Sequence, residues 1–80
     1  MIKIAIDFRR NEEKHIDKLK SKGFSIGKNT DKSIWVFDIK YIYSLVAPND
    51  SYITQLTLES KKDSYSIDIK DIEYFEIHTI

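Results

Sequence analysis

Apolar and polar residues alternate in several segments of this 80-residue chain, most cleanly in residues 1–8. A period of two is typical of a β-strand with one buried face. In the first strand, expected over residues 1–8, Ile2, Ile4, Ile6 and Phe8 share one face. Further strands are expected over residues 24–28, 33–47, 52–59, 65–69 and 72–80. The pattern therefore predicts a protein made mostly of sheet.

The stretch between the first two strands carries helix signals at both ends. Asn11 suits an N-cap, and Gly23 suits the left-handed residue that follows a helix. With Gly23 in that position, Leu19 and Phe24 become the pair that touches in a Schellman motif. Ile16 and Leu19 make only a narrow apolar stripe, so the helix must pack on a sheet to persist.

Residues 33–47 form the most apolar stretch, and fifteen residues is long for one strand. We expect a bulge or sharp bend at Asp38–Lys40. The odd positions look like a core face and hold Trp35, Phe37, Ile39, Tyr41, Tyr43 and Leu45. The even positions then face either the interior of a curled sheet or something outside the monomer; they include Ile34, Val36, Ile42 and Val46.

Polar turns at residues 47–51 and 60–64 separate the later strands, and a corner at Lys70–Asp71 precedes the last one. Two successive hairpins predict an antiparallel meander. The expected fold class is α+β in one domain, residues 1–80. It has one N-terminal strand, one amphipathic helix and then a mainly antiparallel sheet of four to five strands, with a curled sheet or partial barrel as an alternative.

The composition limits the cross-links that the protein can form and the cellular compartment that we expect for it. The chain has no cysteine, which excludes disulfides and thiolate zinc sites, and no apolar run long enough for a signal peptide or membrane span. These features predict a soluble cytoplasmic protein. The net charge is zero, but residues 1–40 carry ten Lys/Arg and six Asp/Glu (+4), whereas residues 41–80 carry three and seven (−4). If the two halves lie apart, one surface is basic and another acidic.

We find no pattern that predicts catalysis, a metal or a cofactor. His15 and His78 have no partners at ligand spacing, and we expect an exposed helix residue and an edge-strand residue respectively. Asp71 and Glu73 are explained more simply as an exposed acidic edge than as a catalytic pair. A chain of this length also leaves little room for a pocket of several hundred Å³. We therefore expect a protein that is not an enzyme.

The preferred hypothesis is a small protein-binding module, plausibly an inhibitor or immunity-type protein that masks a basic partner such as a toxin or nuclease. The apolar and aromatic content exceeds what one helix can cover, and such a surplus indicates an interface. The candidate aromatic surface comprises Trp35, Tyr41, Tyr43 and Tyr52. The candidate acidic surface comprises Asp63, Asp68, Asp71, Glu73 and Glu76.

Two alternatives remain open. A nucleic-acid-binding regulator would use a basic helix face with a spacing of four, made of Arg10, Lys14, Lys18 and Lys22, together with aromatic residues that stack on bases. A homodimeric structural or interaction protein would bury the aromatic strand of residues 33–46 against its own copy.

Overall fold

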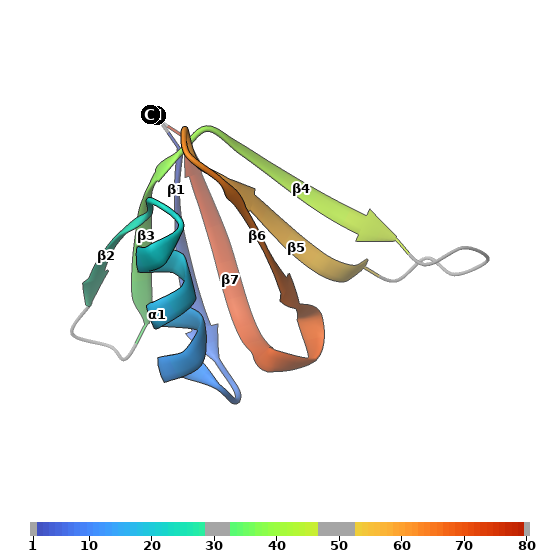
Figure 1. The fold of residues 1–80 in the computed structure, drawn as a ribbon. Coiled ribbons are helices and arrows are strands. Elements are labelled where there is room, and N and C mark those ends of the chain that lie inside the picture. Colours follow the sequence, from blue (N-terminus) through green and yellow to red (C-terminus); the bar gives the residue numbers. More distant parts are fainter. Residues whose placement is uncertain (1, 29–32, 47–52, 80) are drawn as a thin grey trace.

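Seven strands and one α-helix make up the parts of the chain that the computed structural model describes, which are residues 2–28, 33–46 and 53–79. In chain order the elements are β1 (Ile2–Phe8), α1 (Glu12–Ser21), β2 (Ser25–Lys28), β3 (Ile34–Ile39), β4 (Tyr41–Val46), β5 (Ile53–Glu59), β6 (Ser64–Asp68), the 3-10 turn η1 (Ile69–Asp71) and β7 (Ile72–Thr79) (Figure 1). Within these ranges, no helix is both long and apolar enough to cross a membrane.

The strands form two antiparallel sheets, with strand orders β2-β3-β1-β7 and β4-β5-β6 (Figure 1). The expected α+β class is therefore confirmed, and the described strands do not close into a barrel. In the larger sheet β1 and β2 flank β3, which is the arrangement of a split β-α-β unit. The last strand does not extend the meander. It returns to the first strand and pairs with it along its whole length.

The core lies between the inner face of the four-stranded sheet, the helix and the three-stranded sheet. Ile4 and Ile6 of β1 stand opposite Val36 and Ile34 of β3, and all four are buried together with Leu19 of α1. The three-stranded sheet contributes buried residues from its own inner face, namely Leu56, Leu58 and Ile67. The alternation predicted for the first strand is thus confirmed.

The bend predicted at Asp38–Lys40 is present and separates the two sheets. Asp38 has a positive φ of 63°, and Ser25 Oγ donates a hydrogen bond to its carboxylate. After the bend, Lys40 N donates to the carbonyl of Glu59 at 2.7 Å, which starts the second sheet. The chain between residues 33 and 46 is therefore two strands in two sheets.

The prediction that the odd positions of this stretch form the core face is wrong for most of the described residues. Of these positions only Ile39 is buried. In β4, Tyr41 and Tyr43 are exposed, whereas Ile42, at an even position, packs against the core. Ile34 and Val36, at even positions, are buried under α1, whereas Trp35 and Phe37 lie half-buried on the opposite face. Both sets are apolar, so alternation alone could not decide between them. The inner face was settled by packing against the helix, which no local pattern in β3 reveals.

The helix ends as the sequence predicts. Phe24 N donates to the carbonyl of Leu19 at 3.1 Å and Gly23 N to that of Lys20 at 3.3 Å, which are the two bonds of a Schellman motif. At the other end Asn11 occupies the N-cap position but has a left-handed backbone (φ 61°), and its side chain makes no capping hydrogen bond. Its amide lies instead 3.5 Å from Asp71 Oδ2.

We expect the Gly23→Ala variant to be less stable than the wild type by about 1–2 kcal/mol. Gly23 has a φ of 97°, and an added Cβ would lie 3.1 Å from Ser60 Oγ and 3.2 Å from Lys62 Cβ. Urea unfolding followed by circular dichroism measures the loss, with the exposed Ser21→Ala variant as control. A Gly23→Ala variant as stable as the wild type would show that the Schellman motif does not depend on glycine.

Candidate functional site

The face of the four-stranded sheet that points away from α1 carries an aromatic cluster. Trp35 stacks on Phe37 with ring centroids 6.4 Å apart, and His78 meets Trp35 edge-on at 5.0 Å. Lys3 Nζ lies 4.6 Å from the centroid of the Trp35 ring, a cation–π contact. The helix and the three-stranded sheet pack on the other side of the four-stranded sheet (Figure 1). We call this surface the outer face.

Small neighbours leave room around the indole ring. Trp35 stands opposite Ala5 on β1 and opposite Gly27 on β2. A Cβ at Gly27 would lie 3.2 Å from Phe37 Cε2, so the missing side chain lets the Phe37 ring lie close to the β2 backbone. The cluster is therefore flanked by the neighbouring strands of its own sheet, β1 on one side and β2 on the other.

Carboxylates border the aromatic cluster on the β1–β7 side. Asp7 stands opposite Tyr74, and Ala5 opposite Glu76, so all four residues belong to the outer face. Glu76 accepts a hydrogen bond from the Tyr74 hydroxyl at 3.3 Å and lies 3.3 Å from His78 Nε2. Tyr74 is 56% exposed, which makes it the most exposed large hydrophobic residue in the described parts of the chain.

The other two described candidate aromatic residues lie on a different surface. Tyr41 and Tyr43 are 51% and 46% exposed on β4. Their rings lie 6.2 Å apart, and they stand opposite Glu59 and Thr57 of β5 respectively. The Tyr43 hydroxyl donates to Glu59 at 3.3 Å; partial desolvation and this carboxylate raise the pKa of Tyr43.

The bend at Asp38–Lys40 thus divides the predicted aromatic surface into two. Trp35 belongs to the outer face of the four-stranded sheet, whereas Tyr41 and Tyr43 belong to the three-stranded sheet. Tyr52 lies outside the described residues.

The predicted acidic residues are scattered, and several are paired within the chain. Lys22 Nζ lies 3.0 Å from Asp63, and Arg9 Nε lies 2.7 Å from Glu73. Hydrogen bonds from the Ser64 amide and Lys22 lower the pKa of Asp63. Asp68 accepts a hydrogen bond from the Lys70 N–H at 2.9 Å and so caps η1. Asp71 pairs with His15 and Arg10. Glu76 contacts Tyr74 and His78.

These pairs join residues of the basic half of the sequence to residues of the acidic half. Because β7 pairs with β1, residues just after β1 come next to residues just before and within β7. Arg9 and Arg10 of the first half therefore lie beside Glu73 and Asp71 of the second half.

The predicted basic row is partly engaged as well, and its first and last members, Arg10 and Lys22, lie outside α1. Arg10 Nε lies 3.5 Å from Asp71, and Lys22 is paired with Asp63. Lys14 and Lys18 are exposed. The helix α1 covers the inner face of the four-stranded sheet (Figure 1), whereas Trp35 lies on its outer face.

The expectation that His15 is an exposed helix residue is wrong. His15 is 5% exposed, its ring stacks on Phe8 with centroids 5.0 Å apart, and both of its nitrogens have partners. Nδ1 lies 2.6 Å from the Tyr65 hydroxyl, and Nε2 lies 2.8 Å from Asp71 Oδ2. Asp71 is consequently part of a buried network and not of an exposed acidic edge. His78 does lie on an edge strand, as predicted.

One neutral tautomer satisfies this network completely. With the proton on Nε2, His15 donates to Asp71 and accepts the Tyr65 hydroxyl proton at Nδ1. The hydrogen bond from His15 lowers the pKa of Asp71, and burial together with the Asp71 charge raises the pKa of Tyr65. Sequence reasoning missed the network, although His15 lies four residues before Leu19 on the apolar side of the helix and could have been placed there.

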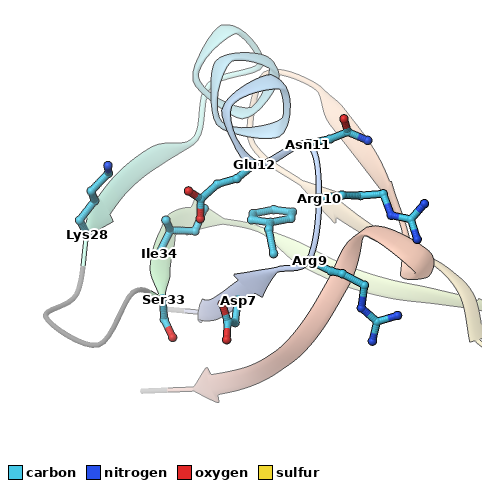
Figure 2. A pocket seen from close by; sticks show the side chains of 9 residues that line it. Asp7, Arg9, Arg10, Asn11, Glu12, Lys28, Ser33 and Ile34 are labelled. Atoms are coloured by element: carbon cyan, nitrogen blue, oxygen red, sulfur yellow. The ribbon is translucent and has the colours of Figure 1, made fainter.

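Two surface hollows are larger than the chain length led us to expect. One of about 480 Å³ lies at the start of α1, and Figure 2 shows the residues that line it; they are Asp7, Phe8, Arg9, Arg10, Asn11, Glu12, Lys28, Ser33 and Ile34. The Arg9 and Arg10 side chains extend away from Glu12 and Lys28, and they pair with Glu73 and Asp71 (Figure 2). A second hollow of about 390 Å³ lies beside Gly23.

Neither hollow is lined by a histidine in the described parts of the chain. Across residues 2–28, 33–46 and 53–79, no three His, Asp or Glu side chains gather as metal ligands. Comparison with protein-family models, curated proteins and solved structures finds no match to this chain. The outer face is therefore the surface whose geometry best supports a function.

Proposed function

We propose that this chain is a small, non-enzymatic protein-binding module that docks a partner on the outer face. The observation that carries the proposal is the Trp35 cluster on a sheet face that α1 leaves uncovered. Large aromatic residues held in one orientation are the side chains that most often dominate binding energy at protein interfaces. Trp35 is held by Lys3, Phe37 and His78 before any partner arrives.

The partner class we propose is a protein segment with apolar and basic side chains. Asp7 and Glu76 supply negative charge beside Ala5, and Tyr74 supplies an exposed ring between them. A basic side chain of the partner can pair with these carboxylates while an apolar one packs on Trp35. An inhibitor or immunity-type protein of the cytoplasm fits this scheme, because masking a partner requires only a surface of matching shape and charge.

A random peptide library selected on the purified protein tests the proposal. We expect the enriched peptides to combine aromatic or aliphatic residues with Lys or Arg. The Trp35→Ala variant should bind them at least about tenfold more weakly. The Tyr74→Ala and Asp7→Lys variants change exposed or rim positions and should weaken binding several-fold without loss of fold. Tyr41→Ala, on the other sheet, is the matched control.

Two outcomes would contradict this proposal. Enriched peptides that bind the Trp35, Tyr74 and Asp7 variants as tightly as the wild type would show that another surface recognises them. Tight binding of a labelled single-stranded oligonucleotide that falls steeply with salt, and fails after Lys14→Glu and Lys18→Glu, would favour the nucleic-acid alternative instead.

A further inference from the structure

The four-stranded sheet ends in an unusually open edge. β7 runs over eight residues and pairs only with β1, and no described backbone hydrogen bond links its other edge to the rest of the chain. The opposite end of the sheet, β2, has only four residues. Long edge strands invite pairing with another strand, and proteins usually block them with lysine or proline. Neither residue occurs in β7.

We infer that β7 pairs with β7 of a second copy of this chain, antiparallel and around a two-fold axis at Ile77. Ile77 is 46% exposed in the monomer although it stands opposite the buried Ile4. An axis at this residue places Ile77 against the Ile77 of the copy. The pairing extends the four-stranded sheet into one sheet of eight strands and joins two outer faces. It does not rest on the proposed docking function, although Glu76 and His78 also belong to the outer face.

The side chains of Glu76 and His78 on β7 select this register. With the axis at Ile77, each Glu76 stands opposite His78 of the copy. The contact that Glu76 and His78 make within one strand can then also form between the two strands, once on each side of the axis. An axis at Glu76 would place two carboxylates together, and an axis at His78 would place two imidazoles together. An axis at Phe75 would require pairing through the irregular register between Tyr74 and Ile72.

The first strand of the other sheet offers no comparable selection. β4 is also at the end of a sheet, but it contains no charged residue that could fix one register over another. The side-chain pattern of β7 is therefore the more specific of the two for self-association.

Sedimentation or light scattering of the full chain without any partner tests the inference. We expect twice the 9.5 kDa mass of one chain at micromolar concentration. The Ile77→Lys variant should be monomeric, whereas Tyr43→Lys, at an equally exposed position on β4, should remain a dimer. Glu76→Lys and His78→Glu should each raise the dissociation constant roughly tenfold, and the double exchange should restore it.

An engineered disulfide checks the register directly. The chain has no cysteine, so the Ile77→Cys variant carries a single thiol. Residues directly opposite each other in an antiparallel pair have Cα atoms about 4.5–5.5 Å apart, within disulfide range. We expect rapid cross-linking of Ile77→Cys and little of Tyr43→Cys. A wild-type protein that stays monomeric at about 100 µM would overturn the inference. Equal cross-linking of the Ile77→Cys and Tyr43→Cys variants would also overturn it.

Discussion

Replacement of His15 by alanine is expected to lower the free energy of unfolding by about 2–4 kcal/mol. The change removes a buried ring that stacks on Phe8 and leaves the Asp71 carboxylate and the Tyr65 hydroxyl without their shared partner. Urea unfolding at pH 7 measures the effect. Lys14→Ala, an exposed neighbour on the same helix, is the matched control and should change stability little.

A second variant separates packing from hydrogen bonding. His15→Phe keeps a ring against Phe8 but can neither donate to Asp71 nor accept from Tyr65. It should therefore remain well below the wild type in stability, because two polar groups lose their partner in a largely buried site. If His15→Phe is as stable as the wild type, the hydrogen bonds of this network do not stabilise the fold.

The same network gives the stability a dependence on pH. The folded-state pKa of Asp71 lies below its usual value, chiefly because His15 donates a hydrogen bond to the carboxylate. The stabilisation is therefore present above the unfolded-state pKa of about 3.9 and is lost as the pH falls through the lower folded-state value. Between pH 5 and pH 3, the wild type should lose stability more steeply than the Asp71→Asn variant.

The Leu58→Ala variant is expected to lose about 2–5 kcal/mol, which is much of the stability of a domain this small. Leu58 is completely buried in β5, between Ile42 and Tyr65 on the neighbouring strands. Its side chain belongs to the single core that joins both sheets and the helix. Thermal or urea unfolding should show one transition at a lower midpoint, with the whole molecule affected.

The control for this variant is the adjacent residue on the other side of the sheet. Thr57 is half-buried, and its hydroxyl lies 2.8 Å from that of Ser66. Thr57→Ala should cost no more than about 1 kcal/mol. Two separate transitions in Leu58→Ala, one of them at the wild-type midpoint, would show that the three-stranded sheet unfolds independently of the four-stranded one.

Local signals in the sequence were sufficient for the elements of the fold. The alternation in β1 and the Schellman motif at Gly23 were predicted because they depend on neighbouring residues. The bend at Asp38–Lys40 followed from the length of the apolar stretch. The assignment of the inner face of β3 failed, because both of its faces are apolar and only the position of α1 decides which one is buried.

The candidate site was harder to predict because it is assembled from distant strands. Trp35 was identified, but its neighbours Lys3 and His78 are brought to it by pairing between β3, β1 and β7. The same pairing brings Arg9 beside Glu73, one of the predicted acidic residues. Periodicity gives the face of a strand but not its neighbours, so neither result could be read from the sequence.

The pairing of β1 with β7 also bears on how the molecule forms. Ile2 stands opposite Thr79, so one strand ladder joins residues separated by almost the whole described chain. Closing such a large loop is entropically costly, and folds rich in distant contacts form in milliseconds to seconds rather than microseconds. During synthesis β1 therefore cannot complete its pairing with β7 until residues 72–79 have left the ribosome, and one edge of β1 stays unpaired until then.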